Sequence, residues 1–288
     1  MGIISVEKSD HLFWLGRYVE RVFTTLNTFF TYYDRMLDTE KEAYKHFCER
    51  LSIPDIYENQ EDFVQKYLFS KEDGNSVYSS MERAYDNAVV LRDELSSRTL
   101  SYIQLALDCM EKHAGSGAFA YDLQPVLDDL FAFWGCLDDN VEDEECRNII
   151  KCGKYLERLD LYMRLDYPYR MIEKEYNKFL NRLHKIRIHY NLSEIDTFNE
   201  IMNLGDGWRG RDDARRGSEP CLDRGVPRRR GLGACGSHGR RTRRRRRRPC
   251  GRPTAANCRR RLSCARRSES RRTWPSTMVS MTMRVWGC

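Results

Sequence analysis

From residue 205 onward the sequence contains no lysine, isoleucine, phenylalanine, tyrosine or glutamine. A segment that lacks most large apolar side chains cannot bury enough surface to fold, so we expect residues 205–288 to be disordered. Arginine dominates there, with 25 arginines against six acidic residues and a net charge of +19. Residues 1–204 carry a net charge of −13. We therefore predict a folded acidic domain over residues 1–204 and a disordered basic tail over residues 205–288.

The abrupt change of composition in this tail has two explanations. A shifted reading frame over GC-rich DNA would produce such a mixture of arginine, glycine, cysteine and proline. A genuine basic arm is the alternative, since the arginine run at residues 243–248 would bind nucleic acid or another polyanion. Nucleic acid is therefore expected as a partner only if the tail is a real product.

The sequence also lacks a run of about 18 apolar residues, so no membrane partner is expected. None of its eleven cysteines forms a Cys-x-x-Cys pair. Free thiols are typical of a reducing compartment, and we predict a cytoplasmic protein.

Helical bundles that hold two metal ions normally carry Glu-x-x-His motifs, which this sequence lacks. His11 and His46 each follow a glutamate by four residues instead. No glycine-rich phosphate loop precedes a predicted helix. We expect no metal and no cofactor.

The segments that are present predict helices and no strands. In residues 12–37 the apolar positions alternate in steps of three and four, which indicates one long packed helix. Ser9 or Asp10 is a candidate N-cap for it. Further helices are predicted over residues 40–51, 61–69, 77–113 with a kink or split at Ser96-Ser97, 123–137, from the acidic connector 138–145 to about 166, and 169–190, with a last one capped by Ser193. The fold class is all-α, a bundle of long helices.

Two of these helices match after a shift of 137 residues. The segment GRYVER at residues 16–21 aligns with GKYLER at residues 153–158. The apolar seam positions Leu12, Leu15, Val19, Val22 and Leu26 also align with apolar residues, namely Ile149, Cys152, Leu156, Leu159 and Met163. A glycine in both copies would allow another backbone to approach closely. The sequence thus predicts a bundle of two related halves around a pseudo-twofold axis.

These residues carry a family resemblance. Residues 12–21, residues 153–158 and the segment RAYDNA at residues 83–88 with Arg92 resemble the bacterial alpha-E domain family, over residues 5–204. The resemblance implies an all-helical domain associated with circularly permuted ATP-grasp ligases and transglutaminase-like proteins. Such an enzyme is the expected partner. Nothing after Leu204 resembles the family.

The repeated motifs supply the candidate site. Glu20 and Glu157 are candidate acid–base groups. The candidate ligand-binding residues are Arg17, Tyr18, Arg21, Asn87, Arg92, Lys154, Tyr155 and Arg158. If the copies face each other, their cations could hold a phosphate or carboxylate. The alternative is a structural ion network that fixes the register of two helices.

Three functions remain open at this point. The first is an accessory domain that positions a partner enzyme or a peptide-like substrate in an ATP-dependent amide-ligation or peptide-modification pathway. The second is an enzyme that uses Glu20 or Glu157 on an anionic substrate. The third is nucleic-acid binding through the tail.

Overall fold

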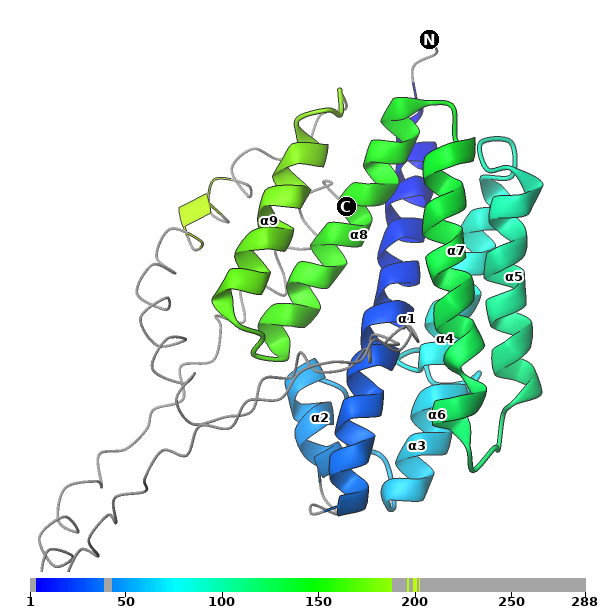
Figure 1. Ribbon diagram of the computed structural model, residues 1–288, viewed down its shortest axis with the longest axis vertical. Coiled ribbons are helices and arrows are strands. Elements are labelled where there is room, and N and C mark those ends of the chain that lie inside the picture. The colour runs from blue at the N-terminus through cyan, green and yellow to red at the C-terminus, as the bar shows by residue number, and fades with distance from the viewer. Residues whose placement is uncertain (1–3, 39–42, 188–195, 197–198, 201, 203–288) are drawn as a thin grey trace, which may run out of the picture. The chain divides into compact units, whose positions relative to one another are not determined.

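The computed structural model describes residues 4–38, 43–187, 196, 199, 200 and 202, and this part of the chain contains helices and no strand (Figure 1). The predicted all-α fold class is confirmed. These described residues belong to one compact unit. The basic tail, the domain boundary at Leu204 and most of the helix expected after Ser193 lie outside the described part and stay predictions.

Among the described residues, the predicted helices are present in the expected order with different bounds, and one short helix at residues 119–122 was not predicted. They are α1 (Val6–Asp38), α2 (Ala43–Leu51), α3 (Gln60–Phe69), α4 (Val77–Val90), α5 (Ser97–Lys112), α6 (Phe119–Asp122), α7 (Gln124–Asn140), α8 (Glu144–Arg164) and α9 (Tyr169–Leu183).

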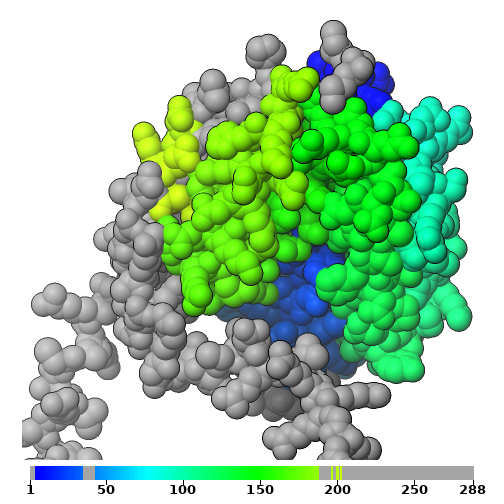
Figure 2. Space-filling model, turned by 45° about the horizontal axis from the view of Figure 1, so that its top comes forward, coloured from blue at the N-terminus to red at the C-terminus, as the bar shows by residue number. Residues whose placement is uncertain are grey.

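Helix α1 is the central element of the bundle (Figure 1). It packs along α8 and α4, while α9 packs on α8, and α5 packs on α4 and α7. Its predicted apolar seam is buried at Leu12, Leu15, Val19, Val22, Leu26 and Phe29. In the view of Figure 2 the later helices cover most of α1, which is visible only in small blue areas. The three-and-four spacing therefore predicted the buried face correctly.

Polar residues at the helix starts explain several of these bounds. Asn59, Ser76 and Ser96 each accept a hydrogen bond from the backbone amide three residues later, at the starts of α3, α4 and α5. Asp143 caps α8 in the same way. Pro125 lies in the first turn of α7, as predicted. Such caps satisfy amides that have no partner within the helix.

The helix expected over residues 77–113 is two helices, α4 and α5, so the alternative of a split is the correct one. The chain leaves the helix after Val90 and re-enters it at Ser97 because Ser96 caps the new helix. Leu91 and Leu95 are both buried between the two helices, so the break keeps its apolar residues in the core.

The acidic connector is shorter than expected. Helix α7 continues to Asn140 and α8 begins at Glu144, so only residues 141–143 of the expected connector 138–145 are not helical. Acidic residues at a helix C-terminus are unfavourable, but here Lys151 of α8 pairs with Asp138.

The start of α1 also differs from the expectation. The helix begins at Val6, where Ser5 accepts a hydrogen bond from the Lys8 amide at 3.2 Å. Ser9 lies inside the helix and donates its hydroxyl to the Val6 carbonyl oxygen at 2.6 Å, so neither Ser9 nor Asp10 is the N-cap.

Candidate functional site

The two helices that carry the repeated motif, α1 and α8, run in the same direction and cross at their glycines. A Cβ atom added to Gly16 would overlap the carbonyl oxygen of Ile150, and one added to Gly153 would overlap that of Phe13. The contacts are reciprocal, because Ile150 and Gly153 lie 137 residues after Phe13 and Gly16. Only glycine permits this approach, so the crossing fixes the register of the two motifs.

The charged residues of the two motifs meet just beyond this crossing. Arg21 Nε donates to Glu157 Oε1 at 2.6 Å, and Arg158 Nε donates to Glu20 Oε1 at 2.6 Å. Glu20 is 0% exposed and Glu157 is 1% exposed. Each buried carboxylate is therefore held by the arginine of the other motif. These reciprocal pairs agree with a pseudo-twofold arrangement, while the duplication of two whole halves stays a prediction.

Glu157 is the better satisfied of the two carboxylates. Arg17 Nε donates to its second oxygen at 2.6 Å, so two arginines bind one carboxylate. Burial acts to raise the pKa of Glu157, but the charges and hydrogen bonds of Arg17 and Arg21 outweigh it and lower the pKa to about 2. Glu157 is therefore ionised at neutral pH and has no proton to donate.

Glu20 is less well satisfied because Lys154 stands where the other motif has Arg17. The Lys154 ammonium lies 3.7 Å from the ring centroid of Trp134. Burial lowers the pKa of Lys154 to about 8, opposed by the nearby charge of Glu20. Thr24 donates to Glu20 Oε1 at 2.7 Å, but Glu20 Oε2 is buried with no hydrogen-bond partner in the described part.

Helix α9 extends the network on the Glu20 side. Arg158 Nη1 lies 3.5 Å from Glu175 Oε2, and Lys178 donates to Glu175 Oε1 at 2.7 Å. Sequence reasoning missed Glu175, a buried acidic residue on an otherwise apolar helix face.

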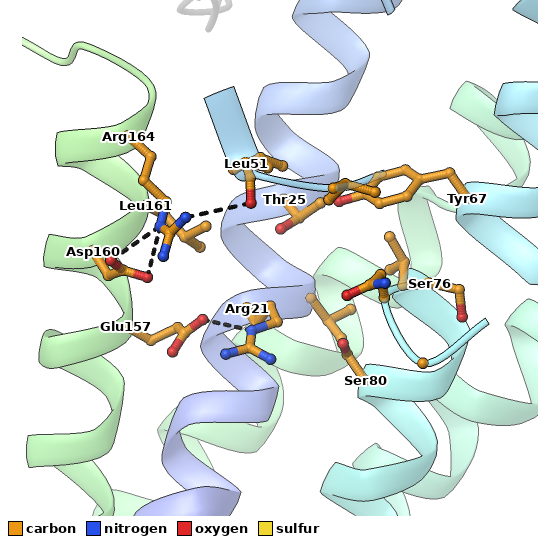
Figure 3. Close-up of a pocket in the computed structure, with 15 residues that line it drawn as sticks. Arg21, Thr25, Leu51, Tyr67, Ser76, Ser80, Glu157, Asp160, Leu161 and Arg164 are labelled. Atoms are coloured by element: carbon orange, nitrogen blue, oxygen red, sulfur yellow. Dashed lines mark hydrogen bonds and ion pairs between the residues drawn. The ribbon is translucent and has the colours of Figure 1, made fainter. Parts of the chain in front are cut away.

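A pocket of about 190 Å³ adjoins the network on the Glu157 side (Figure 3). Arg21 and Glu157 belong to both the network and the pocket. The first turn of α4, with Ser76 and Ser80, lines it from another side. The remaining wall comes from α1, α8, Tyr67 of α3, the end of α2 with the residue Ile53 after it, and the loop before α4.

Asp160 and Arg164 complete the charged lining of this pocket, and sequence reasoning missed both. Arg164 Nε lies 3.1 Å from each oxygen of Asp160. Burial raises the pKa of Asp160, with Arg164 opposing and the charge of Glu157 assisting. Their spacing of three and seven residues from Glu157 places them on one helix face and could have indicated them.

The remaining predicted ligand-binding residues lie apart from the buried pairs. Asn87 accepts a hydrogen bond from His11 Nδ1 at 2.8 Å. Arg92 is 76% exposed, with Asp93 at 4.0 Å. The structure therefore brings neither Asn87 nor Arg92 into the network.

The two predicted tyrosines border the network without entering it. Tyr18 stacks on Trp14, and the guanidinium of Arg21 lies 5.5 Å from its ring centroid. Tyr155 lies under Lys178 at 5.5 Å.

Residues 4–38 and 43–187, with the four further residues described, include no cluster of three potential metal ligands. None of the described helices is long and apolar enough to cross a membrane. The five described cysteines, Cys48, Cys109, Cys136, Cys146 and Cys152, are free thiols.

A family model matches residues 8–185; it is described as a predicted alpha-helical domain with a conserved ER motif. The chain belongs to the Alpha-E family. In this Alpha-E domain, the Glu-Arg dipeptides at residues 20–21 and 157–158 are the ones that pair with each other across the helix crossing. No curated protein and no solved structure matches the chain. The family resemblance deduced from the motifs is thus confirmed.

Proposed function

We propose that this Alpha-E domain is an accessory domain, which positions a partner enzyme or a peptide-like substrate in an ATP-dependent amide-ligation or peptide-modification pathway. The partner would be an ATP-grasp-type ligase or a transglutaminase-like protein. The observation that supports this role best is the mutual pairing of the two Glu-Arg motifs. Each carboxylate binds an arginine of the opposite motif, so these charges hold the two central helices together.

The electrostatics of the two glutamates favour positioning over acid–base chemistry. Glu157 is kept ionised by two arginines, and its pKa lies far from the values that suit a general acid at neutral pH. Glu20 is fully buried and does not line the described pocket. Carboxylates that are occupied by internal ion pairs suit a positioning domain better than a catalytic one.

The test is reconstitution with an ATP-grasp ligase encoded beside the domain. We expect a complex in a pull-down and faster ATP-dependent ligation by the complex than by the ligase alone. Arg92→Ala changes an exposed side chain that belongs to neither the network nor the pocket. As a control, this variant is expected to keep the stability of the domain, its complex with the ligase and the ligation rate. No complex, together with unchanged ligase turnover, would contradict the proposal.

A second candidate is an enzyme in its own right. The role predicted for Glu20 and Glu157 stays a prediction, and the pocket favours a different residue, Asp160. It lines the cavity, and its pKa is raised by burial, as expected of an acid–base group. On this hypothesis Asp160→Asn abolishes the catalytic turnover of the domain, whereas Glu20→Gln reduces turnover only by lowering stability. Losses of turnover that follow the melting temperature equally in both variants would exclude the hypothesis.

A further inference from the structure

The pocket between α1, α4 and α8 presents hydrogen-bond donors that no part of the described chain uses. Arg21 is the first of them. Its Nε is bound to Glu157, but its two terminal nitrogens have no hydrogen-bond partner among the described residues. The side chain is 32% exposed, and Figure 3 shows its guanidinium between Glu157 and Ser80. One face of a buried ion pair is therefore open to a ligand.

Ser80 is the second donor and an independent observation. Its residue is 3% exposed and lines the pocket, yet its hydroxyl has no hydrogen-bond partner in the part of the chain that the structure describes. Ser80 Oγ is not one of the fully buried side-chain atoms without a partner, so the hydroxyl is reached from the pocket. A ligand oxygen in the pocket would satisfy it.

The N-terminus of α4 contributes a third positive element. Ser76 caps the helix by accepting from the Ser79 amide, and Ser76 and Val77 line the pocket. The amides of Val77 and Tyr78 have no acceptor within the described residues. The first turn of this 14-residue helix therefore adds a partial positive charge beside Arg21 and Ser80.

The charge around the pocket selects the kind of anion. The charged side chains that line the pocket are Arg21, Glu157, Asp160 and Arg164, and their charges sum to zero. A lining without net charge accepts a monoanion at a lower electrostatic cost than a dianion such as phosphate.

Part of the uncharged lining is apolar. Leu51, Ile53 and Leu161 border the same cavity. A small ligand with an aliphatic body next to its charge would bury that body against these side chains.

We propose that this pocket binds the carboxylate of a small ligand, such as the C-terminal end of a short peptide, through Arg21, Ser80 and the first turn of α4. The choice of a peptide as the source of the carboxylate rests on the function proposed above. The binding itself is a property of this chain alone and is measured without a partner.

The experiment titrates the full-length protein with N-acetyl-L-alanine and follows the backbone amide signals of Val77 and Ser80 by NMR. N-acetyl-L-alaninamide is the matched ligand control, because it has the same body without the charge. We expect the acid to shift both signals and the amide to leave them in place. Inorganic phosphate, as a third probe, is expected to bind more weakly than the acid.

Two pocket variants and one matched control test the contacts. Arg21→Gln is expected to weaken binding of the acid at least tenfold, roughly the value of one charge-assisted hydrogen bond. Ser80→Ala is expected to weaken binding of the acid by about threefold to tenfold. If Arg21→Gln does not fold, the result for Ser80→Ala tests the contacts in its place. Arg158→Gln removes the equivalent arginine on the far side of the crossing, which does not line the pocket, so affinity is expected to change less than about twofold. All variants keep the same arginine-rich residues 205–288, so anion binding there is common to them.

Three results would overturn the inference. Equal responses to the acid and the amide would show that no carboxylate is recognised. Tighter binding of phosphate would assign the pocket to phosphate. Equal losses in Arg21→Gln and Arg158→Gln, with no loss in Ser80→Ala, would attribute the effect to stability. Loss of carboxylate binding with the partner complex intact contradicts only this inference, whereas intact binding without any effect on a ligase contradicts only the proposed function.

Discussion

At the scale of single residues, the two motifs have equivalent positions but unequal electrostatics. Glu157 is bound by two arginines, while Glu20 is bound by one and keeps a buried oxygen without a hydrogen bond in the described part. Lys154 replaces the second arginine and remains over Trp134. A lysine cannot bind a carboxylate with the planar fork of an arginine, so this substitution is not neutral.

Glu157→Gln is predicted to destabilise the protein by roughly 3–5 kcal/mol. Removing one partner of a buried ion pair leaves uncompensated charge inside the protein, here on Arg17 and Arg21. Urea unfolding measures the change. Glu111→Gln, which breaks an exposed pair with Lys71, is the control and is expected to have little effect. Comparable losses in the two variants would contradict the prediction.

Lys154 predicts a pH dependence of stability at alkaline pH. Its folded pKa of about 8 lies below the ordinary 10.5, because burial outweighs Glu20 and Asp138, while Arg158 and Lys151 assist the shift. Between these values the unfolded chain binds a proton that the folded chain has lost, so the free energy of unfolding rises with pH. The free energy of unfolding of the wild type, taken relative to that of Lys154→Met, is predicted to rise by about 2–3 kcal/mol between pH 7 and pH 10. A constant difference across this range would show that Lys154 titrates normally.

At the scale of helices, the crossing of α1 and α8 depends on two small positions. The approach at Gly16 and Gly153 brings each backbone against the other, and the ion pairs follow from it. A larger residue at either position separates the helices and lengthens every contact between the motifs. The crossing and the network are therefore one structural unit.

Gly16→Ala is predicted to destabilise the protein by roughly 3 kcal/mol, because the added methyl group overlaps a backbone carbonyl that cannot move alone. Gly135→Ala in α7 is the matched control. Nothing lies within 4 Å of a Cβ added there, so alanine is expected to stabilise the helix by about 0.5–1 kcal/mol. Thermal and urea unfolding of both variants give the comparison. A neutral Gly16→Ala would indicate a wider crossing.

The helices and their buried faces were largely predictable from the sequence. The spacing of Leu12, Leu15 and Val19 gave the core face of α1, and glycine at position 16 indicated the close approach. The pairing of Glu20 with Arg158 was predicted only as a possibility, because a pattern along one helix does not say which neighbour it faces.

The pocket could not be predicted in the same way. Its lining comes from α1, α2, α3, α4, α8 and the loops between them, and no spacing along the chain relates Arg21 to Ser80 or Asp160. The end of α7 was misjudged for a similar reason, since it depends on the pairing of Asp138 with Lys151 across two helices. Tertiary contacts decided both features.

At the scale of the whole molecule, a chain ending at Leu204 is predicted to unfold at the same midpoint as the full chain. All the buried residues described here lie before that point. The shortened chain carries a net charge of −13 and is expected to lose any binding to nucleic acid, whereas the full chain would bind it with a steep dependence on salt. Nucleic-acid binding by the shortened chain, or salt-independent binding by the full chain, would contradict this.

The reciprocal crossing gives this single chain an interface of the isologous kind normally found in homodimers. Because each motif fits the other and the two are nearly alike, a fragment with only the first motif carries a self-complementary surface. Two fragments divided between α4 and α5 are expected to reassemble when mixed, and the N-terminal one to self-associate at high concentration. The intervening sequence then acts as a tether that raises effective concentration, and it favours the intramolecular pairing over association between copies.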